Sequence, residues 1–204
     1  MPVASIYDLK PAFQRLLRPI CQRLAAAGMT ANQVTLAALG LSLAAGAVLA
    51  LSGGAAWALW LLPVALFLRM GLNAIDGMLA REHGQASRLG ALLNELADLA
   101  SDAALYLPFA LVPGLWPGWV AAVVVLALIA EAAGLLGPMV GAARRYDGPF
   151  GKSDRAAAFG LIAVLLASGL AGPGLVNWAL PVMAALAVWT MVNRVRGALA
   201  EGAA

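Results

Sequence analysis

The chain has 204 residues, of which 63% are apolar and only 11% are charged, and its mean hydropathy is +0.87. A soluble domain carries about 25% charged residues. This composition therefore excludes a soluble domain and a disordered chain, and the 13 Lys and Arg residues are too few for a nucleic-acid-binding surface. We expect an integral membrane protein. The one cysteine, Cys21, excludes an intramolecular disulfide.

The N-terminal segment, residues 8–28, predicts an amphipathic helix. Arg15, Arg18 and Arg23 are spread among leucines at helical spacing, and Gly28 is a typical helix end. We expect this helix on the cytoplasmic membrane surface, with its arginines near anionic head groups. The alternative is an ordinary helix packed against the cytoplasmic end of the bundle.

Six apolar segments are candidates for membrane-spanning helices, which take about 20 residues, although the fifth is short. They cover residues 33–51, 56–80, 89–112, 118–140, 156–171 and 175–193. We therefore predict an all-α membrane protein with six transmembrane helices, forming a single domain over residues 1–204.

The charges predict the orientation. The connections at 52–54, 113–118 and 172–174 carry no charged residue, whereas twelve of the thirteen basic residues fall on the other side. The positive-inside rule then places both termini in the cytoplasm. Eleven Arg against two Lys, with abundant Ala, is typical of a GC-rich bacterial genome, so we expect the bacterial inner membrane. The functional site predicted below should then face the cytoplasm.

Polar residues on two of the expected spans predict a functional site. Asn73 and Asp76 share one face of the second span, and Asn94 and Asp98 share one face of the third. The turn between these spans is short, so the helices must be antiparallel neighbours. Asn and Asp oxygens gathered in one pocket suit a hard divalent cation; an interhelical hydrogen-bond network is the alternative.

Two small residues come soon after Asp76 in the second expected span. Gly77 and Ala80 remove bulk beside the expected cation, as a flat nucleotide would require, although close helix packing would also favour them. Arg69 lies deeper in the second span, and we expect it to pair with Asp102, with Glu131 as the rival partner.

The stretch from Asn73 to Asp98 resembles the signature of the CDP-alcohol phosphotransferase family, D-x2-D-G-x2-A-R-x8-G-x3-D-x3-D. The spacing agrees throughout, and every fixed position matches except Asn73 and Asn94, where the family has Asp. Thr30–Thr35 and Gly151–Arg155 also resemble the family's entries into its first and fifth spans.

The resemblance implies a homodimeric membrane enzyme of phospholipid biosynthesis. Such an enzyme transfers a phosphatidyl or related group from a CDP-activated lipid, such as CDP-diacylglycerol, to a hydroxyl acceptor and releases CMP. One or two Mg2+ or Mn2+ ions bind at the four signature positions, Asn73, Asp76, Asn94 and Asp98, and Asp98 is the implied general base.

The resemblance also assigns the remaining site residues. The implied nucleotide-binding set is Asn73, Asp76, Gly77, Ala80, Arg81 and Gly90. A phosphate or the acceptor would be bound by Arg144, Arg145, Lys152 and Arg155, although Arg144 and Arg145 are explained equally well as topology signals.

The two Asn residues stand where relatives bridge two metals, so the fixed charge at the four positions is −2 rather than −4. Three outcomes follow. The protein works with one metal, Glu95 and Asp102 supply the missing charge, or the chain is an inactive paralogue that binds CDP-lipid or a partner. A small transporter with buried charges is a further alternative.

Overall fold

The structure is a computed structural model that describes residues 6–202, with side chains from residue 12 onward, so the side chain of Lys10 lies outside the described part. The described residues form helices and no strand, as the sequence predicts. The α-helices are α1 (Ile6–Ala26), α2 (Ala31–Leu51), α3 (Ala56–Leu59), α4 (Leu61–Glu82), α5 (Arg88–Tyr106), α6 (Pro117–Leu135), α7 (Lys152–Ser168) and α8 (Pro173–Gly202), and two 3-10 helices are η1 (Leu107–Leu111) and η2 (Gly137–Val140).

Helices occur at all six predicted spans, but four segments are long and apolar enough to cross a membrane: residues 31–51, 56–82, 117–135 and 173–202. Of the other two helices, α5 carries three carboxylates and α7 has 17 residues. Four apolar helices support an integral membrane protein. The six-span arrangement and the orientation of the termini remain predictions.

Three predicted spans differ in detail from the helices that form. The second is broken at Trp60, because Pro63 has no N–H to bond the Leu59 carbonyl. The third and fourth end early, at Tyr106 and Leu135, and continue as 3-10 turns that contain Pro108 and Pro138. In each case a proline inside an apolar segment interrupts the α-helical hydrogen bonds.

The chain divides into two compact units, and the boundaries between them fall inside α2, α4 and α5. Unit 1 comprises residues 1–42 and 67–101, and unit 2 comprises residues 43–66 and 102–204.

In unit 1 the helix α1 packs through one apolar face. Cys21 is buried together with residues of α2 and α4, and Leu17 and Leu24 pack beside it. Arg18 Nη2 also donates to Glu82 Oε1 at 3.0 Å. Gly28, with φ of +77°, follows the end of α1 as predicted. The helix is thus packed on the protein along one face, while Leu16 and Ile20 of the same helix are exposed.

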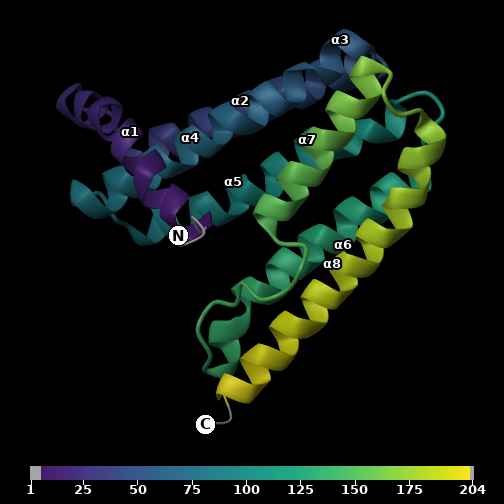
Figure 1. Ribbon diagram of the computed structural model, residues 1–204. Coiled ribbons are helices and arrows are strands. Elements are labelled where there is room, and N and C mark those ends of the chain that lie inside the picture. The colour runs from purple at the N-terminus through teal and green to yellow at the C-terminus, as the bar shows by residue number, and fades with distance from the viewer. Residues whose placement is uncertain (1–5, 203–204) are drawn as a thin grey trace, which may run out of the picture. The chain divides into compact units, whose positions relative to one another are not determined.

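In unit 2 the long helices α6 and α8 run side by side (Figure 1). Tyr106 stacks on Phe159 of α7, with ring centroids 4.2 Å apart, and Phe109 of η1 meets the same ring edge-on. The buried Asn177 of α8 accepts a hydrogen bond from Trp116 N and donates to Gly114 O. These contacts hold the loop before α6 against α8.

Candidate active site

A cavity of about 340 Å3 lies within unit 1, between the beginning of α2, the C-terminal half of α4, the turn before α5 and the first turns of α5. Every residue of the implied nucleotide-binding set lines this one cavity: Asn73, Asp76, Gly77, Ala80, Arg81 and Gly90. Asn94 and Glu95 line it as well. All signature residues except Asp98 thus gather around one space, as the helical spacing predicts, and Asp98 bonds one of them, Asn73.

Side-chain caps fix the helix ends around the cavity. Thr30 and Gln33 form a reciprocal pair at the start of α2: Thr30 N donates to Gln33 Oε1, and Gln33 N donates to Thr30 Oγ1. Ser87 Oγ accepts from Gly90 N and caps α5. Because residues of the first turns of α2 and α5 line the cavity, the positive ends of two helix dipoles favour an anionic ligand there.

The turn between α4 and α5 is anchored to the start of α2 by Gln85. Its Oε1 accepts from Ala31 N at 2.6 Å, and its Nε2 donates to Met29 O at 3.3 Å. No pattern in the sequence singles out Gln85, because a polar residue in a turn gives no sign of which distant backbone groups it will bond.

Glycines keep the cavity open. A Cβ at Gly90 would lie 2.8 Å from Asn32 Oδ1 and 2.9 Å from Ser87 Oγ. A Cβ at Gly77 would lie 3.0 Å from one guanidinium nitrogen of Arg81. The small residues of the signature therefore leave room for polar side chains that line the same cavity.

Asp76 is held by a residue of α2. Thr35 Oγ1 donates to Asp76 Oδ2 at 2.9 Å, and both side chains are buried. Thr35 belongs to the Thr30–Thr35 stretch of the resemblance, but nothing in that stretch identifies its partner.

Asp98 is held from α4. Asn73 Nδ2 donates to Asp98 Oδ1 at 3.1 Å, and Arg69 Nη2 donates to the same oxygen at 3.1 Å and to the Asp98 carbonyl at 3.2 Å. The Arg69 side chain is 4% exposed. Arg69 thus joins the signature residues, four positions before Asn73 on the same face of α4.

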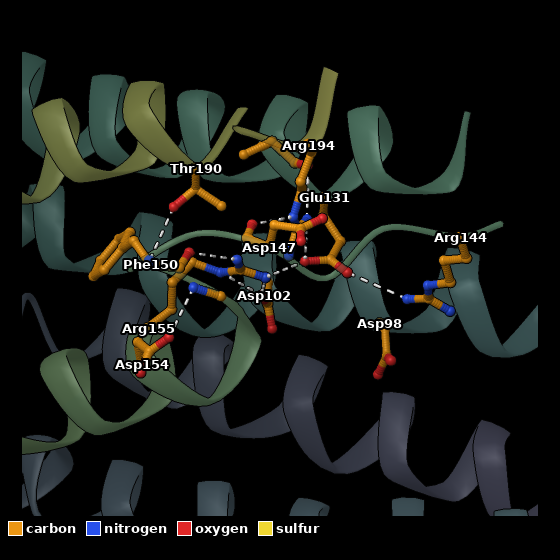
Figure 2. Close-up of polar contacts among 12 residues, drawn as sticks. Asp98, Asp102, Glu131, Arg144, Asp147, Phe150, Asp154, Arg155, Thr190 and Arg194 are labelled. Carbon is orange, nitrogen blue, oxygen red and sulfur yellow. Dashed lines mark hydrogen bonds and ion pairs between the residues drawn. The ribbon is translucent and has the colours of Figure 1, made fainter. Parts of the chain in front are cut away.

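The second group of charged residues belongs to unit 2 and converges on Glu131 of α6 (Figure 2). Its carboxylate accepts from Arg144 at 3.2 Å, from Arg155 at 3.2 Å and from Arg194 at 3.1 Å. Arg155 also donates to Asp102 Oδ2 at 2.8 Å. The Arg155 and Arg194 side chains are 1% and 2% exposed, so this is a buried ion-pair network.

The connection between η2 and α7 is held by further bonds within unit 2. Arg145 donates to Asp147 and to Glu201 of α8. The hydrogen bonds from Arg145 lower the pKa of the Asp147 carboxyl below its ordinary value. Phe150 N donates to Thr190 Oγ1, and Gly151 N donates to Asp154 Oδ2 at the start of α7.

The residues predicted to bind a phosphate or the acceptor all belong to unit 2. Three of them bond carboxylates of the chain itself: Arg144, Arg145 and Arg155. Lys152 is the first residue of α7. Of the two auxiliary acids, Glu95 lines the cavity of unit 1 and Asp102 bonds Arg155 in unit 2. The Arg69–Asp102 pair stays a prediction.

The donor set around the cavity suits a divalent cation. Two carboxylates, Asp76 and Glu95, line it together with amide side chains that include Asn73 and Asn94, and oxygen ligands are those that Mg2+ and Mn2+ prefer. Among the residues described, no three His, Cys, Asp or Glu side chains gather closely enough to hold a metal. A cation bound at this cavity would take amide oxygens as well as carboxylate oxygens as ligands.

A model of the CDP-alcohol phosphatidyltransferase family matches residues 28–192, which include most of both units. The chain belongs to this family. It is accordingly an enzyme of the CDP-alcohol phosphatidyltransferase type, which acts in phospholipid synthesis, and the family match does not favour the transporter or the inactive paralogue.

Two curated proteins are similar in sequence to this CDP-alcohol phosphatidyltransferase. Inner membrane protein YnbA of Escherichia coli K12 is 45% identical over 195 residues, which cover 96% of each chain. Phosphatidylinositol phosphate synthase of Corynebacterium glutamicum is 30% identical over 102 residues, or 50% of this chain and 44% of that protein.

Solved structures of the phosphatidylinositol phosphate synthase of Mycobacterium tuberculosis share the fold of this phosphatidyltransferase. The structure with CDP-DAG bound has a TM-score of 0.74 at 20% identity and covers 90% of this chain and 94% of that one. The structure in complex with manganese and citrate has a TM-score of 0.72 at 20% identity, with 89% and 88% covered.

Proposed function

We propose that this chain transfers the phosphatidyl group of CDP-diacylglycerol to a hydroxyl acceptor and releases CMP, with a divalent cation at the unit 1 cavity. The observation that carries the proposal is the gathering of the whole nucleotide-binding set around one cavity lined by the first turns of two helices. The CDP-DAG bound to the Mycobacterium tuberculosis enzyme supports the choice of lipid, and the manganese complex of that enzyme supports the cation.

The reaction replaces one phosphorus–oxygen bond by another. The acceptor hydroxyl oxygen attacks the phosphorus that carries the lipid, the bond from this phosphorus to CMP breaks, and CMP leaves with the electron pair. When bound, the cation would offset the charge of the pyrophosphate and of the departing CMP. We assign Asp98 as the general base that takes the acceptor proton. Asn73 and Arg69 hold its carboxylate in position.

The nucleotide part of the donor is assigned to the same cavity. Asp76 and Asn94 supply oxygens for the cation, and Asn73 and Asp98, which bond each other, complete the four signature positions of the proposed site. Gly77, Ala80 and Gly90 leave room for the cytidine, while Arg81 supplies a positive charge for its phosphates. The Thr30–Gln33 pair and the Ser87 cap fix the helix ends around this cavity before the donor binds.

For the acceptor we propose contacts with the basic residues before and at the start of α7, Arg144, Arg145, Lys152 and Arg155. Carboxylates already bond Arg144, Arg145 and Arg155, so most of their charge is matched inside the protein. We therefore expect an acceptor that carries hydroxyl groups and no phosphate to be used in preference to a phosphorylated one.

The enzyme is proposed to act as a homodimer in the bacterial inner membrane, as one domain with six spans, with both termini and the site on the cytoplasmic side. The name of the Escherichia coli relative supports the inner membrane. The positions of twelve basic residues support the orientation.

The test is CMP release from CDP-diacylglycerol by the purified protein in detergent, with Mn2+ or Mg2+ and a panel of acceptors with and without phosphate. Asp76→Asn and Asp98→Asn should each lower release at least about 100-fold. Glu82→Gln, in the same unit but in an exposed pair with Arg18, should leave release unchanged. Release that survives a chelator, or that persists in Asp98→Asn, would contradict the proposal.

A further inference from the structure

The contacts of Asp98 bear on the number of cations in the site, a question that the sequence leaves open. Two hydrogen bonds to Asp98 Oδ1 come from nitrogen atoms, Asn73 Nδ2 and Arg69 Nη2, each at 3.1 Å. A cation shared by positions 73 and 98 would need an oxygen from each side chain. Here position 73 presents a hydrogen-bond donor to Asp98 instead.

Arg69 supplies the positive charge at this carboxylate. Its side chain is 4% exposed and that of Asp98 is 16% exposed, so the pair is well shielded from water. A guanidinium is charged at every pH that the protein meets. It therefore does at Asp98 what a bound cation would do, which is to balance the carboxylate charge.

The charge balance of the site also favours one cation over two. The charged residues that line the cavity are Asp76, Glu95 and Arg81, and the Asp98–Arg69 pair adds no net charge, so together they carry −1. The N-terminal ends of α2 and α5 contribute about +0.5 each, which brings the cavity close to neutral. One divalent cation then matches the two negative charges of the donor pyrophosphate, whereas a second would leave a positive excess.

We infer that this enzyme binds one divalent cation per chain, and that Arg69 with Asn73 takes the place of the second. Asp76 is the charged ligand of the single cation, and Arg69 is a positioning residue for Asp98. The inference rests on the proposed function only in placing the cation at the donor phosphates. On this inference the Asn residues at positions 73 and 94 belong to a functional one-cation site and do not mark an inactive paralogue.

The experiment counts Mn2+ bound to the purified protein in detergent, by electron paramagnetic resonance of the free ion during a titration with Mn2+ alone and again with CDP. The wild type should bind one Mn2+ per chain. The double variant Asn73→Asp, Asn94→Asp should bind two, since it restores two carboxylates. Two ions or none in the wild type, or a folded double variant that still binds one, would overturn the inference.

A second measurement addresses Arg69 itself. Arg69→Gln removes a positive charge beside the site, so the affinity for the first Mn2+ should rise by about fivefold or more. Arg69→Lys keeps the charge and should not change it, and Arg23→Gln on the exposed side of α1 is the matched control. An Arg69→Gln variant that binds Mn2+ no tighter than Arg23→Gln would contradict the role of Arg69. If Arg69→Gln does not fold, the ion count of the double Asp variant decides.

Because ion counting needs no turnover, the two proposals fail separately. One ion per chain without CMP release from any acceptor would refute the proposed function and keep the inference. CMP release with two ions in the wild type would refute the inference and keep the function.

Discussion

Glu131 holds together the buried charges of unit 2, and replacing it by Gln should be among the most destabilising single changes in this unit. Its carboxylate accepts hydrogen bonds from three arginines, of which Arg155 and Arg194 are almost fully buried. Gln has nearly the same shape but no charge. The three guanidinium groups would then lose the negative charge that they share.

The magnitude follows from the cost of leaving a buried charge without its partner, about 3–5 kcal/mol. For a chain of this size about 1 kcal/mol corresponds to a change of about 2–4 °C in Tm. Glu131→Gln should therefore lower Tm by roughly 6–20 °C, within the same relation. Thermal unfolding in detergent, followed by size-exclusion chromatography, measures this shift.

The matched control is Glu201→Gln. Glu201 also accepts from an arginine, Arg145, but its side chain is 42% exposed. Water screens an exposed ion pair, so Glu201→Gln should change Tm far less than Glu131→Gln does. Equal shifts for Glu131→Gln and Glu201→Gln would refute the claim that burial gives the Glu131 network its importance.

Three further predictions concern other parts of the molecule. Gly90→Val should raise the KM for CDP-diacylglycerol about tenfold or more, because the valine side chain would press on Asn32 and Ser87. Gly71→Ala adds a methyl group in open space and should leave the KM unchanged. Equal KM values for the two variants would contradict the shape of the cavity. The lowered pKa of Asp147 contributes stability that is present above the ordinary Asp pKa of about 3.9 and is lost as the pH falls through the lower value in the folded protein. Asp147→Asn should therefore flatten the acid side of a plot of Tm against pH, and an unchanged plot would count against this pair. With Cys21→Ser as background, a cysteine at Gly53 should react with an impermeant reagent added outside intact cells and one at the exposed Ala143 should not; the reverse pattern would refute the predicted orientation.

The Asn residues at positions 73 and 94 give this family member a site with two fewer carboxylates than the family signature specifies. An Asp at position 73 would place a second carboxylate beside Asp98 and would need a cation between them. Asn73 instead donates a hydrogen bond to Asp98 directly. At position 73 the protein itself therefore supplies a hydrogen-bond donor for Asp98.

Much of the architecture follows from the sequence alone. Apolar segments of about 20 residues predict helices, because the backbone groups of a chain in lipid must be bonded within the chain. The positions of Asn73, Asp76 and Gly77 on one face follow from the helical repeat. The short turn between α4 and α5 requires that these helices lie next to each other, so the signature residues from Asn73 to Asn94 line one cavity. Proline positions account for the helix ends that the hydropathy pattern misplaced.

The partners of the charged residues were decided by the tertiary structure. Asp98 bonds Arg69, Asp76 bonds Thr35, and Glu131 bonds arginines that lie 13, 24 and 63 positions away in the chain. Hydropathy and helical spacing give the depth and the face of a side chain on its own helix. They do not give the rotation and separation of two helices, which depend on how all the side chains between them pack. Since a hydrogen bond forms only within about 3 Å, the choice of partner for each buried charge is settled by that packing.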